Sequence, residues 1–76
     1  MGDTFTEIVD IIIDIADMAR EKVTKNSHFV DDLDLTSLEI LAIITKVEKK
    51  YSVKFSKNDF EVITTVGDLV SYLSKS

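Results

Sequence analysis

The residues most able to do chemistry lie close together, where residues 34–39 read Asp-Leu-Thr-Ser-Leu-Glu. Thr36 followed three residues later by Glu39 is a capping box, which predicts a helix whose first residue is Ser37. A helix start presents unpaired backbone N–H groups and the positive end of the helix dipole, so an anion is stabilised there. A phosphate carried on the Ser37 hydroxyl would meet these conditions. The pattern therefore indicates that Ser37 is a point of covalent attachment.

Arrangements typical of catalysis or metal binding do not appear in the sequence. The one histidine, His28, precedes Ser37 in a polar segment, so we expect it at the surface and predict no base beside the serine. There is no cysteine, which excludes a thiolate nucleophile and a cysteine-ligated zinc. The three nearby aspartates lack the glycine and the glutamate of an EF-hand, which leaves only adventitious divalent binding at Asp31, Asp32 and Asp34. The sequence does not predict an enzyme.

The composition limits the classes of partner. The 76 residues carry a net charge of −5, whereas nucleic-acid binding needs a basic surface. The apolar run over residues 8–19 is interrupted by Asp10, Asp14 and Asp17, which argues against a signal peptide and a membrane span. Gly2 and Thr6 formally match a myristoylation pattern, but no second anchoring signal follows, so we do not expect the modification. We expect a soluble, cytoplasmic, monomeric domain whose partners present basic surfaces.

A first helix is predicted over residues 4–20. Thr4 and Glu7 form a capping box at its beginning, and apolar residues recur at the spacing of an amphipathic helix. The opposite face carries an acidic stripe made of Asp3, Glu7, Asp10, Asp14, Asp17 and Glu21. We interpret the acidic stripe as a solvated face, with a docking face for a basic partner as the alternative.

The helical periodicity is lost over residues 21–35, which predicts a long connection that must pack against the core. Phe29 and Leu33 are the residues expected to hold it in place. A second helix is predicted over residues 37–51, with a core stripe of Ile40, Ile43, Ile44, Val47 and Tyr51. A neighbouring stripe is expected to be partly exposed and comprises Leu38, Leu41 and Thr45.

Two further capping pairs predict the remainder of the fold. Ser56 with Asp59 predicts a very short helix over residues 57–61, with Phe60 facing inward. Thr65 with Asp68 predicts a last helix over residues 66–73. We therefore expect one all-α domain over residues 1–76, a small four-helix bundle with three main helices, one short helix and a long first loop.

Several segments between residues 23 and 73 share the order and spacing of a known family. They are Val23-Thr24-x-Asn26-x-x-Phe29-Val30-x-Asp32-Leu33, Ser37-Leu38, Val47-Glu48-x-x-Tyr51 and Ile63-Thr64-Thr65-Val66-x-Asp68. Together they resemble the acyl carrier protein family, and the expected first helix matches in character only. The fold of that family is a helical bundle of the kind that the capping pairs also predict.

The resemblance implies a function for Ser37. A separate phosphopantetheinyl transferase would move 4′-phosphopantetheine from coenzyme A to the Ser37 hydroxyl, leaving a phosphodiester at the helix start. The thiol of this arm would then hold acyl groups as thioesters for enzymes such as a ketosynthase or an acyltransferase. The resemblance also implies a partner-binding face formed by Asp34, Leu38, Glu39, Leu41, Thr45 and Glu48. It implies a cavity for the acyl cargo between the second and third helices, although plain core remains the alternative for its residues Ile44, Val47, Phe60, Ile63 and Leu69.

The sequence departs from the family's pattern beside the serine and along the second helix. Thr36 stands where aspartate is usual, and Asp34 stands where glycine is usual. Ala42, Lys49 and Lys50 occupy positions where acidic residues are usual. We therefore expect a carrier for polyketide or other specialised acyl biosynthesis rather than a housekeeping fatty-acid carrier. The alternatives are an aminoacyl or peptidyl carrier and an unmodified helical interaction module.

Overall fold

The computed structural model describes residues 3–75, which form helices joined by loops and contain no β-strand. The helices are α1 (Thr4–Ala16), α2 (Ser37–Tyr51), α3 (Lys57–Val62) and α4 (Val66–Lys75), with one 3₁₀ turn, η1 (Arg20–Lys22), after α1. The predicted all-α fold with three main helices and one short helix is confirmed. Gly2, the residue of the formal myristoylation pattern, lies outside the described residues.

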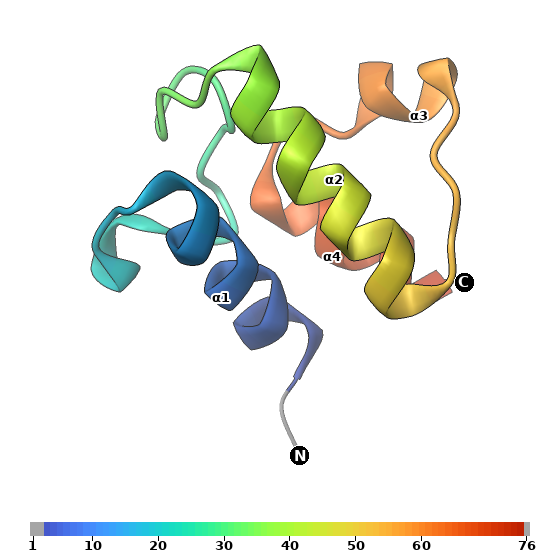
Figure 1. The fold of residues 1–76 in the computed structure, drawn as a ribbon, viewed down its shortest axis with the longest axis horizontal. Coiled ribbons are helices and arrows are strands. Elements are labelled where there is room, and N and C mark those ends of the chain that lie inside the picture. The colour runs from blue at the N-terminus through green and yellow to red at the C-terminus, as the bar shows by residue number, and fades with distance from the viewer. Residues whose placement is uncertain (1–2, 76) are drawn as a thin grey trace.

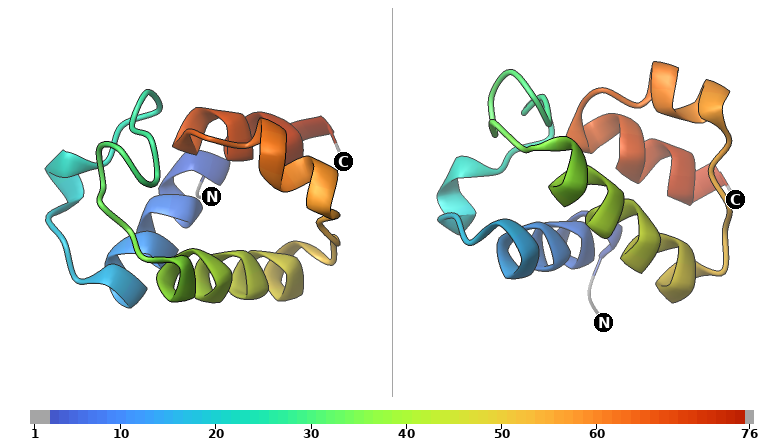
Figure 2. Two further views of the ribbon diagram at one scale, coloured as in Figure 1. Left: turned by 90° about the horizontal axis from the view of Figure 1, so that it is seen from above. Right: turned by 45° about the horizontal axis from the view of Figure 1, so that its top comes forward.

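The three longer helices form the body of the domain. Helix α1 packs against both α2 and α4, and the chain after α2 turns back so that α3 lies beside the first half of α2 (Figure 1). The long connection from η1 to α2 lies next to the first turn of α2 (Figure 2). The start of α2, this connection and α3 therefore lie at the same end of the molecule.

The most deeply buried part of the core is made of aliphatic side chains from these three helices. Those with at most 2% of their surface exposed are Ile8, Val9, Ile12, Ile43, Val47, Val66 and Leu69. Burial of one such side chain stabilises the fold by roughly 1.5–3 kcal/mol relative to leaving it exposed. The predicted core stripe of α2 is confirmed for Ile43, Ile44 and Val47, while Ile40 and Tyr51 are half-buried.

The first helix begins at Thr4, within the predicted range, but its predicted cap and its predicted end are wrong. The N-cap is Asp3, whose carboxylate accepts the N–H of Thr6 at 2.7 Å, so Thr4 is already helical. The helix ends at Ala16, not at residue 20, because Asp17 adopts a left-handed conformation with φ of 53°. Aspartate tolerates this region better than most residues, which explains how the helix can end without glycine.

The acidic stripe is largely solvated, as predicted, since five of its six residues are exposed, but part of it also contacts the rest of the molecule. Asp10 pairs with Arg20, which follows the early end of α1, and Asp14 pairs with Lys46 of α2 at 3.1 Å. The carboxylate of Glu7 accepts a hydrogen bond from the Tyr51 hydroxyl. Three of the six carboxylates of the stripe thus contact groups elsewhere in the same molecule. The stripe therefore helps to hold α1 against α2.

The contact between Tyr51 and Glu7 predicts a pH dependence. Burial, together with the hydrogen bond to the Glu7 carboxylate and its charge, raises the pKa of Tyr51 to about 12 from the ordinary 10.0. The folded state therefore favours the neutral phenol, so this contribution to stability is complete below pH 10 and is lost as the pH rises through 12. Absorbance of tyrosinate in the Tyr72→Phe variant follows Tyr51 alone. Titration of the folded variant at the same pH as the urea-unfolded chain would contradict this assignment.

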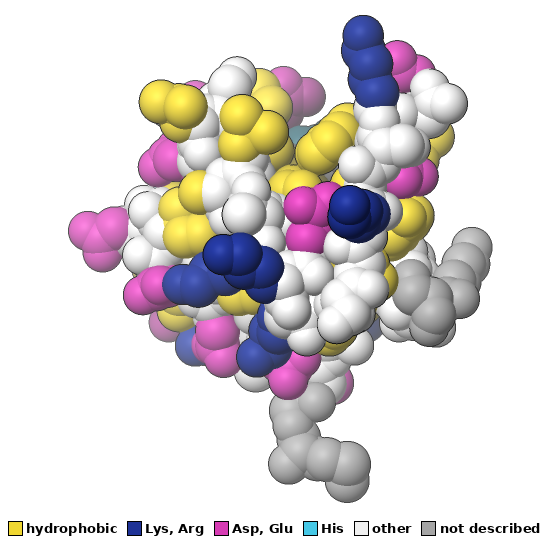
Figure 3. All heavy atoms as spheres, turned by 45° about the vertical axis from the view of Figure 1, so that its right-hand side comes forward, with side chains coloured by type: hydrophobic (Ala, Val, Ile, Leu, Met, Phe, Trp, Pro, Cys, Tyr) yellow, Lys and Arg dark blue, Asp and Glu magenta, His cyan; other side chains and the backbone are white. Residues whose placement is uncertain are grey.

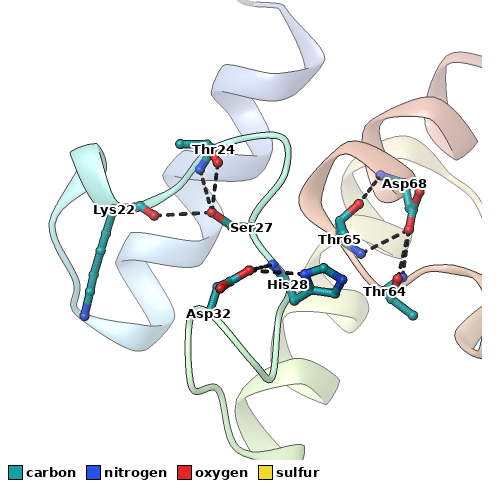
Figure 4. A network of polar contacts seen from close by, with 8 residues as sticks. All are labelled: Lys22, Thr24, Ser27, His28, Asp32, Thr64, Thr65 and Asp68. Atoms are coloured by element: carbon teal, nitrogen blue, oxygen red, sulfur yellow. Dashed lines mark hydrogen bonds and ion pairs between the residues drawn. The ribbon is translucent and has the colours of Figure 1, made fainter.

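The long connection before α2 is fixed by buried side chains and by hydrogen bonds to the start of α4. Phe29 and Leu33 are buried, as predicted. The Ser27 hydroxyl is also buried, accepts the N–H of Thr24 at 2.9 Å and donates to the carbonyl of Lys22 at 3.3 Å (Figure 4). Backbone hydrogen bonds then join the connection to the chain around the start of α4. The N–H of Phe29 donates to the carbonyl of Thr64, that of Val66 to the carbonyl of Ser27 and that of Gly67 to the carbonyl of Lys25.

Helix α3 begins at Lys57, as predicted, with Ser56 and Asp59 forming the expected capping box. The prediction that Phe60 faces inward is confirmed only in part, because this side chain lines a cavity with Ile43 and Ile44 but 37% of its surface is exposed. A helix of six residues offers too short a face to bury a large ring fully. Phe60 instead packs loosely with Phe55, whose ring lies 4.8 Å from that of Tyr72 of α4.

Candidate attachment site at the start of helix α2

Ser37 is the first residue of α2, and the predicted capping box is present. The hydroxyl of Thr36 accepts the N–H of Glu39 at 3.2 Å, and the Glu39 carboxylate accepts the N–H of Thr36 at 2.9 Å. Thr36 itself is extended, with φ of −79° and ψ of 165°. The cap fixes the point at which the chain enters the helix, and Ser37 is exposed there.

The turn before Ser37 explains one departure from the family's pattern. Asp34, at the position where glycine is usual, has a φ of 54°. This left-handed conformation favours glycine but is also adopted by aspartate and asparagine. The N–H of Asp34 donates to the carbonyl of Val30 at 3.1 Å, and the next residue, Leu35, is buried and donates to Phe29 at 3.0 Å. The turn thus anchors the chain two residues before the exposed serine.

The surroundings of Ser37 fit a covalently attached phosphodiester. The residue lies in the first turn of a fifteen-residue helix, where the helix dipole favours an anion. The nearest carboxylate in sequence, Glu39, is held by the cap, so it is turned to the backbone of Thr36. Ser37 and Leu38 are both exposed, and a modifying enzyme can therefore reach the hydroxyl without unfolding the helix.

Two cavities lie between the long connection, α2 and α3. The outer one has a volume of about 350 Å³ and the inner one about 20 Å³. Of the residues predicted to line an acyl cavity, Ile44 lines the inner cavity, and Phe60 and Ile63 line both. Val47 and Leu69 are completely buried core residues and belong to the lining of neither cavity.

Sequence reasoning missed part of the cavity lining. Phe29 and Ile40 line both cavities, and Ile43 lines the inner one. Ile40 could have been found, because it lies one turn after Ser37 on the core stripe of α2. Phe29 could not, because it comes from the irregular connection and reaches the cavity only through the tertiary fold.

The residues predicted to bind partners are divided between free and engaged side chains. Leu38 and Leu41 have 80% and 55% of their surface exposed, and Asp34 and Thr45 are exposed too. The Glu48 carboxylate accepts the N–H of Phe55 at 2.8 Å and therefore supports the α2–α3 connection. Hydrophobic and charged side chains lie side by side on one face of the molecule (Figure 3). The partner-binding role of these residues stays a prediction.

The expectations about metal and catalysis concern His28 and the three aspartates near it. His28 is exposed, as predicted, and its Nδ1 lies 3.1 Å from the Asp32 carboxylate, which also accepts the His28 N–H (Figure 4). These hydrogen bonds lower the pKa of the Asp32 carboxyl. Within residues 3–75 no group of three or more histidine, aspartate or glutamate side chains could hold a metal ion. No helix in this part of the chain is long and apolar enough to cross a membrane.

Comparisons with known proteins identify the family. Residues 6–73 match the family model described as the phosphopantetheine attachment site. The chain is 38% identical over 68 residues to the meromycolate extension acyl carrier protein of Mycobacterium tuberculosis. This match covers 90% of this chain and 59% of that relative. It is 36% identical over 73 residues to the acyl carrier protein of Rhodococcus erythropolis, which covers 96% of this chain and 80% of the relative.

A solved structure supports the same relationship. A candidate acyl carrier protein from Mycobacterium tuberculosis superposes with a TM-score of 0.84 at 31% identity, and the match covers 93% of this chain and 95% of that one. The chain spans about three fifths of the length of the meromycolate relatives that it matches. The helical fold, the match to the attachment-site model and the relatives agree, and the chain belongs to the acyl carrier protein family, whose members carry phosphopantetheine.

Proposed function

We propose that this protein is a carrier that holds acyl intermediates on a 4′-phosphopantetheine arm attached to Ser37. The observation that carries the proposal is the exposed serine at the capped start of α2, within the segment that matches the attachment-site model. The arm supplies a terminal thiol, which forms thioesters with acyl groups. This chain has no cysteine, so the arm is the only source of a thiol for that purpose.

The protein's own residues present and orient the arm. The cap formed by Thr36 and Glu39 fixes the first turn of α2, so the Ser37 hydroxyl points from a rigid helix instead of a mobile loop. The helix dipole stabilises the negative charge of the phosphodiester at this position. No residue of the chain is assigned a catalytic role, and partner enzymes make and break the bonds to the cargo.

We also propose that the two cavities receive the acyl cargo. Their apolar lining comes from the long connection, α2 and α3, and includes Phe29, Ile40, Ile43, Ile44, Phe60 and Ile63. The inner cavity is only about 20 Å³, room for little more than one water molecule, so it does not hold an acyl chain as it stands. A cargo therefore rests in the outer cavity unless Phe60 and α3 move.

The partners in this proposal are a phosphopantetheinyl transferase and acyl-processing enzymes such as a ketosynthase or an acyltransferase. The pathway is one that extends acyl chains, of the fatty-acid or polyketide type. Relatives that are named for meromycolate extension support an extending pathway. The lysines on α2 and the threonine before Ser37 support a specialised one.

The proposal is tested with the unmodified protein, coenzyme A and a broad-specificity transferase. Intact mass is expected to show the addition of one phosphopantetheine group. Subsequent acylation should add a group that hydroxylamine removes, because thioesters react with this nucleophile and amides do not. If several transferases leave the mass unchanged, the chain is an unmodified interaction module and the proposal fails.

A change at Thr36 is expected to speed the modification. Thr36→Asp restores the residue that is usual before the serine, and aspartate caps a helix at least as well as threonine, so the start of α2 should persist. We expect the rate of phosphopantetheine transfer to rise severalfold, because the added carboxylate provides a group for the transferase or its metal ion. The Thr36→Asn variant keeps the cap without the charge and serves as the control. An equal rise in both variants would refute a role for the charge.

A further inference from the structure

The exposed side of α2 changes in character along its length. Its first half carries the apolar side chains of Leu38 and Leu41 next to Ser37. Its second half, the connection to α3 and the first residue of α3 carry exposed lysines, in a protein whose net charge is −5. These residues are Lys46, Lys49, Lys50, Lys54 and Lys57. Lysine side chains gather over the middle of the face in Figure 3, and hydrophobic side chains lie above them.

The lysines fall into two groups according to what lies beside them. Lys46 pairs with Asp14, and together with Lys50 it lines a hollow shared with carboxylates of the acidic stripe. Lys49 and Lys54 instead line a hollow of about 420 Å³ whose lining includes no residue of α1. Within residues 3–75, no ion pair involves Lys49 or Lys54. Their charges are therefore available to a partner.

The hollow contains one carboxylate, that of Glu48, so its lysines outnumber its carboxylates by two to one. Glu48 is half-buried, and its Oε2 accepts the N–H of Phe55, so this group is committed to the chain that follows α2. The other lining residues, Thr45, Ser52 and Val53, carry no charge. The hollow therefore carries an excess of positive charge, which favours a docked protein with carboxylates.

This basic hollow is continuous with the apolar residues near Ser37. Lys49 also lines a second hollow of about 510 Å³, together with Leu41, Ala42, Thr45, Lys46 and Ile15 of α1. A protein that covers Leu41 while it reaches the arm on Ser37 must therefore lie next to Lys49. Contact with Leu41 and access to the arm on Ser37 therefore place a partner on one surface, which runs from Leu38 to Lys54.

We propose that Lys49 and Lys54 form a docking site for an acyl-processing enzyme that carries acidic side chains beside its active-site entrance; the proposal rests on the proposed carrier function. The enzyme places an apolar contact on Leu38 and Leu41 and its carboxylates on Lys49 and Lys54. This preference is opposite to the one that the net charge of the protein indicates. It separates the enzymes that this carrier serves from those that recognise acidic surfaces.

The net charge argues against other occupants. An anionic membrane or a nucleic acid is repelled by a protein of charge −5, and two neighbouring lysines offer few contacts to a polyanion. A second copy could place its acidic stripe on the lysines, but three carboxylates of the stripe already have partners within the molecule. Neither objection applies to an enzyme with a local acidic patch.

The test uses the acylated protein and two sets of purified ketosynthases, chosen beforehand for acidic or basic side chains around the active-site entrance. Transfer to the acidic set is expected to have the higher kcat/KM at low salt, with the difference shrinking as salt is added. Lys49→Glu and Lys54→Glu should each lower kcat/KM for the acidic set about tenfold, because like charges then oppose each other. The matched control is Lys22→Glu in η1, which makes the same change of charge on an exposed lysine elsewhere and should have no such effect.

Every other outcome counts against the proposal. Faster or equal transfer to the basic set, no transfer to the acidic set, or an equal effect of Lys22→Glu would overturn it. Salt-sensitive self-association in sedimentation, or binding to phosphatidylglycerol vesicles, that disappears in Lys49→Glu would assign the surface to a second copy or to a membrane. Intact mass recorded before the assay distinguishes failure of the docking proposal from failure of the carrier function. A protein that never acquires phosphopantetheine overturns the carrier function itself.

Discussion

Replacing Ser37 with alanine is expected to abolish phosphopantetheine transfer completely. The hydroxyl is the only part of this side chain that can form the phosphodiester, and the capping groups of Thr36 and Glu39 remain in place without it. Alanine is also the best helix former, so α2 should begin at the same residue. Intact mass after incubation with coenzyme A and transferase measures the effect. A circular dichroism spectrum equal to that of the original protein shows that the fold is kept.

The matched control for this experiment is Ser71→Ala. Ser71 is an exposed serine within α4, and the substitution makes the same chemical change away from the start of α2. The control should be modified at the rate of the unchanged protein. Persistence of the added mass in Ser37→Ala would assign the attachment to another residue, and equal loss in both variants would point to an effect unrelated to the hydroxyl.

The second large effect is expected at Gly67, where helix α4 meets the long connection. The N–H of Gly67 donates to the carbonyl of Lys25 at 2.8 Å, and a Cβ placed on Gly67 would lie only 2.8 Å from the same oxygen. This oxygen belongs to the backbone, so it cannot rotate away as a flexible side chain would. Gly67→Ala must therefore push the connection from the start of α4 and break the hydrogen bonds that join them.

We expect Gly67→Ala to lower the free energy of unfolding by about 1–3 kcal/mol, the usual cost of forcing extra volume into a packed site. The gain in helix propensity opposes this by at most about 1 kcal/mol. Urea unfolding measures the net effect, and an m-value equal to that of the original protein shows that the change is one of stability. Ser71→Ala in the same helix gains propensity without a clash and should be at least as stable as the original. A Gly67→Ala protein of equal or greater stability would contradict the close approach.

Local capping chemistry explains why so much of the fold could be predicted from the sequence. The capping boxes at Thr36 and Ser56 and the pair formed by Thr65 and Asp68 each placed a helix start at the correct residue. The predicted cap of the first helix was wrong because Asp3 and Thr4 are both good caps, and nothing local decides between them. The predicted end was wrong because the left-handed residue there is Asp17 and not glycine, so no glycine in the sequence marks the end of the helix.

The candidate site was predictable only where it depends on local structure. Ser37 could be placed because the helix start itself fixes its exposure and its surroundings. The cavity could not be placed in full, because its lining combines α2 with Phe29 from an irregular loop and with a ring on α3 that remains exposed. The difference between Lys46, which pairs with Asp14, and Lys49, which has no ion pair among the described residues, was also out of reach, since it depends on where α1 lies against α2.

The most direct test of the carrier function is to locate the modification within the unaltered protein. After incubation with coenzyme A and transferase, trypsin should release peptide 26–46, which contains Ser27, Thr36, Ser37 and Thr45. Fragmentation that preserves phosphodiesters then identifies the modified residue. We predict phosphopantetheine on Ser37 alone, since Ser27 is buried and its hydroxyl is hydrogen-bonded. Modification of any other residue, or no modified peptide, would contradict the function proposed for the start of α2.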